Sequence, residues 1–126
     1  MTGPFWIRLG AIFAGLAVAA GAFGAHALRD RLSTRMLEIF ETGAHYQMVH
    51  ALALIAVGVT AMQRTSAALT VAGVGFSIGI LLFSGSLYAL AISGVTKLGM
   101  ITPFGGLAFL VGWTALAVAA LGKAEI

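Results

Sequence analysis

The stretch that decides the fold of this chain reads LGAIFAGLAVAAGAFGAHAL, residues 9–28. It contains no charged residue, and it is bounded by Arg8 on one side and by Arg29, Asp30 and Arg31 on the other. A helix needs about 20 apolar residues to cross the roughly 30 Å hydrocarbon core of a bilayer. The stretch therefore predicts a transmembrane helix.

Three further runs of this kind follow, at residues 44–62, 67–92 and 100–121. The chain has seven basic and four acidic residues, and all of them fall outside the four runs. We therefore predict an all-α fold in which residues 1–126 form one domain, a membrane four-helix bundle with both termini on the same side. Ala25-His26-Ala27 also resembles a signal-peptide cleavage site, but the apolar run before it is longer than the roughly 7–15 residues of a secretory signal.

Composition excludes a soluble domain. Hydrophobic residues make up 60% of the chain and charged residues 9%, whereas soluble domains carry about 25% charged residues. The basic residues are scattered along the chain, so no nucleic-acid partner is expected. The predicted location is the inner (plasma) membrane, with the lipid bilayer as the first partner. Basic residues divide almost evenly between the two sides, which leaves the orientation open.

Residues 29–43 form the only long connection, between the first and second spans, and a helical pattern covers residues 32–43 of it. Leu32, Met36, Ile39 and Phe40 recur at the spacing of one helix face. The pattern predicts a short amphipathic helix lying in the membrane interface, with its apolar side toward lipid or toward the bundle. Ser33 or Thr34 is its expected N-cap. By the same reasoning, Thr102 before Pro103 is predicted to cap the fourth span.

Small residues recur along the spans at helical spacing. Lipid removes the hydrophobic drive for helix association, so close backbone approach at small residues must supply it. The residues predicted to pack helix against helix are Gly10, Ala14, Ala17, Gly21, Gly75, Gly79, Ala108 and Gly112. They pack the four helices of the bundle against one another, or one row of them mediates self-association or docking onto other membrane subunits.

Polar residues gather at one membrane face. Topology places there the end of span one, the start of span two, the end of span three and the start of span four, with Lys97 nearby. Polar groups in hydrocarbon are costly unless they are paired, so we expect these residues to face inward. The predicted polar intramembrane cluster consists of His26, His45, Tyr46, Gln47, His50, Ser84, Ser86, Tyr88 and Thr102.

Several roles for this cluster stay open. In the first, the cluster holds the helices together through hydrogen bonds. In the second, Ser77, Ser84 and Tyr88, which share one face of the third span, line a pore or carrier for a small solute in an oligomer. A third alternative is a metal or haem held by histidine, with His26 and His50 as the candidate ligands. No spans carry a charged residue, the chain has no cysteine, and no nucleophile motif is present. We therefore predict no catalytic residues, no bound metal and no cofactor.

Four sequence blocks together resemble the YgdD-like family of small four-span membrane proteins. The blocks are residues 21–28, GAFGAHAL; 42–54, TGAHYQMVHALAL; 82–88, LFSGSLY; and 98–107, LGMITPFGGL, followed by Gly112-Trp113. That family is a domain of unknown function with a mitochondrial branch in animals. The resemblance implies a four-span inner-membrane protein and leaves its biochemical role open. From the small-residue stripes, we expect an interaction or accessory subunit and not an enzyme.

Overall fold

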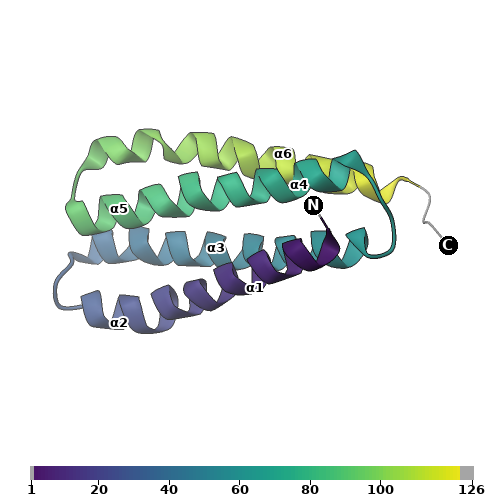
Figure 1. Ribbon diagram of the computed structural model, residues 1–126. Helices are drawn as coiled ribbons and strands as arrows, with labels where there is room; N and C mark the ends of the chain where they lie inside the picture. The colour runs from purple at the N-terminus through teal and green to yellow at the C-terminus, as the bar shows by residue number, and fades with distance from the viewer. Residues whose placement is uncertain (1, 123–126) are drawn as a thin grey trace.

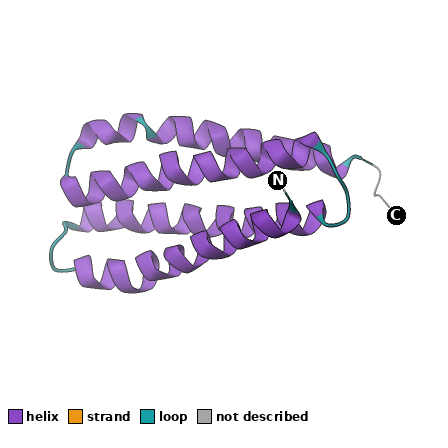
Figure 2. Cartoon of the chain, in the orientation of Figure 1, coloured by secondary structure: helices purple, strands orange, loops and turns teal. Residues whose placement is uncertain are grey.

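Four long helical stretches run antiparallel along one axis in the computed structural model, which describes residues 2–122 (Figure 1). In these residues all regular secondary structure is helical (Figure 2). All four stretches are long and apolar enough to cross a membrane, which confirms the prediction of four membrane helices. They are Gly3–Leu28, Thr34–Ala61, Ala67–Ser93 and Thr96–Ala120.

Three of the four spans are composite. The first combines α1 (Gly3–Val18), a π-helical segment η1 (Ala19–Gly24) and α2 (Ala25–Leu28); the second is α3 (Thr34–Ala61); the third combines α4 (Ala67–Gly79), a π-helical segment η2 (Ile80–Ser84) and α5 (Gly85–Ser93); and the fourth combines a 3₁₀ helix η3 (Thr96–Met100) and α6 (Thr102–Ala120). π-Helical turns are rare and occur mostly as interruptions of α-helices.

The first span begins six residues before the charge-free run because its N-terminus is well capped. The Thr2 hydroxyl accepts a hydrogen bond from the Phe5 amide, and Pro4 lies in the first turn, where its missing N–H costs nothing. Arg8 is consequently inside the helix, on its exposed side. A long basic side chain can extend from such a position to the headgroups.

The amphipathic segment between spans one and two is helical, but it is not a separate helix. Ser33 caps it as predicted, with its hydroxyl accepting from the Met36 amide, and the helix then continues unbroken to Ala61. Phe40 and Ala44 are buried on the same side. The apolar face of this segment therefore packs against the bundle, one of the two directions expected for it. Residues 34–43 extend the second span, and the prediction of a short helix lying in the interface was wrong.

Thr102 does not cap the fourth span. α6 follows η3 directly, with Ile101 already helical at the cap position, and the Thr102 hydroxyl is bonded to Ser86 instead. The turn before η3 depends on Gly94, which has a φ of +74° and ends α5 with its N–H donated to the Leu90 carbonyl. Glycine adopts this left-handed conformation without steric cost.

The helices associate mainly as two pairs, α1 with α3 and α4 with α6, and the middle spans join the pairs. Where the two pairs meet, Trp6, Leu54, Phe76 and Phe109 lie in one buried core. The two ends of the bundle are distinct in Figure 1: α1 begins and α6 ends at the same end as the α3–α4 loop. The other two loops lie at the opposite end.

The small residues that were expected to pack helices are mostly found at these contacts. A Cβ atom on Gly10 would lie 2.7 Å from the Ala51 carbonyl oxygen, and one on Gly75 would lie 3.0 Å from that of Ala108. Gly79 and Gly112 give room to the rings of Phe109 and Phe76. Ala17 is buried, Ala14 is partly buried and Gly21 is exposed.

Single cysteines in this cysteine-free chain test the topology. Membrane-impermeant thiol reagents are expected to label Thr2→Cys and Thr65→Cys from one side of the membrane, and Arg35→Cys and Lys97→Cys from the other. Hydrocarbon excludes loops, so each loop must lie at one face. Labelling of positions 2 and 97 from the same side would contradict the arrangement.

Candidate functional site

The buried polar side chains of the described residues come from the second and third spans. They are Gln47 and His50 on α3, Ser84 at the end of η2 and Ser86 on α5. An unpaired polar group in a membrane interior is costly. Each of these four has a partner within the bundle, and the partners define what the site can do.

Gln47 connects three spans through its amide group. Its Nε2 donates to the backbone carbonyl of Phe13 on α1 at 2.8 Å, and its Oε1 accepts from the Tyr88 hydroxyl on α5 at 2.7 Å. The amide has both donors and an acceptor, so one side chain can satisfy a carbonyl and a hydroxyl at once. The Tyr88 ring also packs against Phe40, with 5.0 Å between ring centroids.

His50 connects α3 to α6. Its Nδ1 lies 2.7 Å from the Tyr46 carbonyl oxygen, and its Nε2 accepts from the indole N–H of Trp113 at 3.0 Å. A carbonyl oxygen only accepts and an indole nitrogen only donates. His50 is therefore the neutral tautomer with its proton on Nδ1. Its ring stacks on Phe109, with 3.5 Å between centroids.

The two serines fix the π-helical turn of the third span. Ser84 is 0% exposed, and its hydroxyl donates to the Gly43 carbonyl of α3 at 2.7 Å. Ser86 donates to the Phe83 carbonyl at 3.0 Å, so its oxygen accepts the hydroxyl of Thr102 on α6. These bonds attach η2 and α5 to both neighbouring helices.

Some members of the predicted polar cluster lie on the outside of the bundle, although all of them were expected to face inward. His26 was expected to face inward, but it is exposed on α2 and its Nδ1 lies 3.2 Å from the Arg29 guanidinium. His45 is exposed as well. So is Tyr46, which was also expected to face inward, and its ring packs on that of Phe83 with 4.5 Å between centroids. The structure thus brings together Gln47, Tyr88 and His50 with the serines, and leaves His26 and His45 outside.

Histidine ligation of a metal or haem gains no support from this arrangement. Among residues 2–122 no group of three histidine or carboxylate side chains is placed to hold an ion. Both ring nitrogens of His50 are already bonded to protein groups. The site is a set of satisfied hydrogen bonds between helices.

Sequence reasoning missed two participants. Trp113 was noted only as part of a motif, although an indole N–H inside an apolar span needs an acceptor. The Phe13 carbonyl had no signal in the sequence, because a backbone acceptor exists at every residue.

The fold and its internal hydrogen bonds define a multi-pass four-helix membrane protein. The chain belongs to the family described as protein of unknown function (DUF423), which it matches over residues 20–106. It is 47% identical to a UPF0382 membrane protein of Staphylococcus epidermidis over 92% of this chain and 94% of that protein. Identity to the UPF0382 membrane protein YwdK of Bacillus subtilis is 45%, covering 92% of this chain and 95% of the relative.

A further relative supports the predicted location. The UPF0382 inner membrane protein YgdD of Escherichia coli is 38% identical over 96% of this chain and 92% of that protein. Both the predicted family and the predicted inner-membrane location are thereby confirmed. No solved structure matches the chain.

Proposed function

We propose that this protein is an interaction or accessory subunit of a membrane assembly, and that it has no catalytic activity of its own. The observation that carries the proposal is where its polar and apolar groups lie. The buried polar side chains of the cluster already have hydrogen-bond partners inside the bundle. What the protein offers to its surroundings within the membrane is therefore an apolar helix surface.

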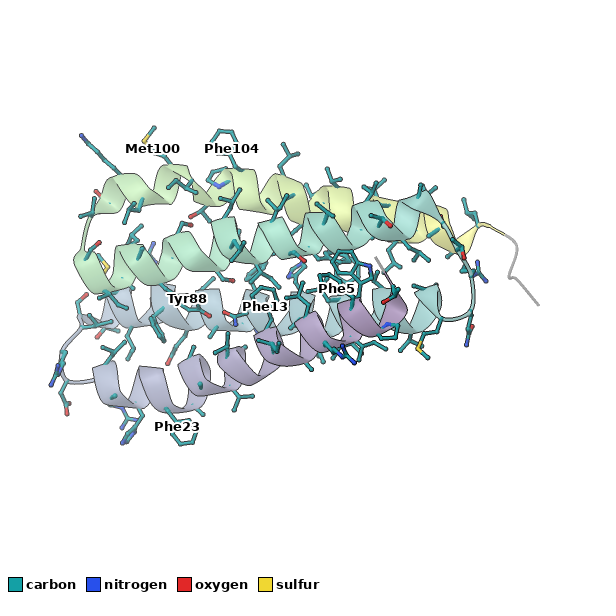
Figure 3. The ribbon with its side chains drawn as sticks, in the orientation of Figure 1. Phe5, Phe13, Phe23, Tyr88, Met100 and Phe104 are labelled. Atoms are coloured by element: carbon teal, nitrogen blue, oxygen red, sulfur yellow. The ribbon has the colours of Figure 1, made fainter. Side chains whose placement is uncertain are left out.

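That surface is concentrated on the outer spans. In an apolar stretch of 18 residues within each span, the share of residues buried inside the bundle is 11% for the first span and 17% for the fourth, against 44% for each middle span. Two phenylalanines project outward on opposite sides, Phe23 from the first span and Phe104 from α6 (Figure 3). Helix association in membranes depends on van der Waals packing, and the exposed faces of these two spans are available for it.

The rival function, a pore or carrier for a small solute, has less support. Its proposed lining was Ser77, Ser84 and Tyr88, but Ser84 is fully buried and its hydroxyl is bonded to α3. The Ser77 hydroxyl donates to the Gly73 carbonyl of its own helix. An oligomer could expose this seam to a solute only after the bundle opened.

Native mass spectrometry after gentle extraction tests the proposal. We expect the 12.9 kDa chain to be retained in an assembly with other subunits or with copies of itself. Phe23→Ala or Phe104→Ala is expected to weaken that assembly, because each removes a ring from an outer span. Leu81→Ala, at an exposed position of η2, is the control and should leave it intact.

Two results would overturn the accessory role. One is a lone monomer under conditions that keep other membrane assemblies together. The other is a homo-oligomer that gives selective solute flux in liposomes, with the flux abolished by a bulky substitution at Ser84.

A further inference from the structure

The side of α3 that points away from the bundle forms one continuous surface, the α3 face, made of the a and d positions of a heptad repeat. All of these positions are exposed; they are Arg35, Glu38, Thr42, His45, Val49, Leu52, Ala56 and Val59. The b, c and f positions of the same repeat are buried or partly buried against the other helices. The second span therefore packs into the bundle through one side and leaves a surface with coiled-coil spacing on the other.

The N-terminal half of the α3 face carries polar groups that have no partner. A hollow of about 360 Å³ lies over it, lined by Glu38, Glu41, Thr42, His45 and Tyr46. In the part of the chain that the structure describes, the carboxylates of Glu38 and Glu41 and the hydroxyl of Tyr46 make no hydrogen bond or ion pair. These groups can therefore bond to a molecule that covers the face.

The polar groups lie at a depth where the neighbouring span is apolar. The Ser84 hydroxyl donates to the Gly43 carbonyl, so this part of α3 runs beside the start of α5. Because the two spans are antiparallel, Glu41 is level with α5, whose exposed residue Ile92 lies still nearer the end of the bundle. A carboxylate at this depth is costly in lipid and is expected to have a partner.

The C-terminal half of the α3 face is apolar and has the residue types of a two-stranded pair. Val49 is at an a position and Leu52 is at the next d position, a combination that favours two parallel helices. Ala56, at the following a position, is small enough for two helices to approach closely. This half therefore fits a second α3 that runs in the same direction.

We propose that the α3 face is the interface of a homodimer, in which two copies of the chain lie side by side with the same orientation in the membrane. In a parallel pair, the residue at position g lies beside position e of the following heptad in the partner. Glu41 is at position g, and Tyr46 is at position e of the following heptad. Each Glu41 carboxylate therefore accepts the hydroxyl of Tyr46 from the second copy, and the two-fold axis repeats the bond.

This dimer does not rest on the accessory role. That role uses the exposed surfaces of the first and fourth spans, whereas the dimer uses the second span. A chain that forms the dimer and binds no other subunit would support one proposal and contradict the other.

Single cysteines on the α3 face of this cysteine-free chain test the interface in native membranes. Each residue of the face meets its own copy across a two-fold axis, so a membrane-permeant oxidant should link Val49→Cys, Leu52→Cys and Val59→Cys into covalent dimers. Ile78→Cys is the matched control, because Ile78 is 45% exposed and Leu52 55%, but Ile78 lies on α4. The control should link only at the background rate of random collision.

Three results of this experiment would overturn the proposal. The first is linking on the α3 face that does not exceed that of Ile78→Cys. The second is a linked product that contains a different protein in place of the second copy. The third is linking of Val49→Cys without Val59→Cys, since only a parallel pair brings both positions to their own copies.

A hydroxyl deletion tests the bond between the copies. Tyr46→Phe removes the hydroxyl and keeps the ring that packs on Phe83. It is expected to weaken dimerisation about tenfold, the loss for a hydrogen bond to a charged group. Energy transfer between labelled copies over a series of lipid dilutions measures the change. Ser93→Ala removes an exposed hydroxyl that donates within α5, and it should leave dimerisation unchanged.

Two further variants keep the test decisive. Phe23→Ala alters the first span and should not change dimerisation, so a loss equal to that of Tyr46→Phe would contradict an interface on α3. If Tyr46→Phe does not fold, Glu41→Ala at an exposed position removes the acceptor of the same bond. Unchanged dimerisation in Glu41→Ala would then contradict the assignment.

Discussion

Replacing Gly105 with alanine is expected to destabilise the bundle by about 3 kcal/mol, the upper part of the usual range for overpacking. Gly105 lies on α6 where that helix crosses η2. A Cβ atom there would lie 2.7 Å from Phe83 Cα and closer still to the Phe83 amide nitrogen. Backbone atoms cannot move aside as the end of a side chain can, so the two spans must separate.

The matched control is Gly15→Ala, on the exposed side of α1, where a Cβ atom would have no heavy atom within 4 Å. Alanine is the better helix former, so this variant should be as stable as the parent or slightly more stable. Equilibrium unfolding in mixed detergent micelles measures both. Equal stability of the two variants would show that α6 does not approach Phe83 as closely as the structure has it.

Gly105 also illustrates why some contacts could not be predicted. Gly75, Gly79 and Gly112 recur at helical spacing, and the expectation that they pack helices agrees with their close contacts. Gly105 adjoins Gly106 and does not continue a stripe of small residues at helical spacing, so it is not among the residues predicted to pack helices. Whether a glycine is a contact depends on which helix lies opposite, and a single sequence does not contain that information.

The positions of the spans could be predicted because crossing a membrane depends on an apolar run of sufficient length. The direction of side chains near the end of a span could not. His26 follows η1, where the backbone takes the wider π turn. One additional residue in a turn rotates all later residues by about 100°. No pattern in residues 19–24 predicts this turn. The inward direction predicted for His26 was therefore wrong.

The polar cluster likewise has features that the sequence predicts and features that it does not. Topology was sufficient to place Gln47, Ser84 and Tyr88 at one membrane face, and the structure joins them through α3. Which atoms pair depends on distances of a few tenths of an ångström, which periodicity does not specify. The two serine bonds to α3 and α6 both lie at the C-terminal end of η2.

A double-mutant cycle on Gln47 and Tyr88 is the second large effect that we expect. Gln47→Leu removes the acceptor of the Tyr88 hydroxyl and the donor to the Phe13 carbonyl. The partly buried Tyr88 hydroxyl then has no acceptor, and the Phe13 carbonyl keeps only the hydrogen bond of its own helix, at a cost of about 1–3 kcal/mol. Tyr88→Phe should cost less, because only the Gln47 Oε1 loses a partner.

The double variant separates the bond from the two side chains. If the Gln47–Tyr88 bond contributes as interhelical bonds in membranes do, the two losses should fall short of additivity by about 0.6–1.7 kcal/mol. Ser77→Ala is the control, because its hydroxyl donates within its own helix and joins no two spans. Unfolding in mixed micelles gives the four free energies. Strict additivity of the Gln47 and Tyr88 losses would show that Gln47 does not connect the second span to the third through this bond.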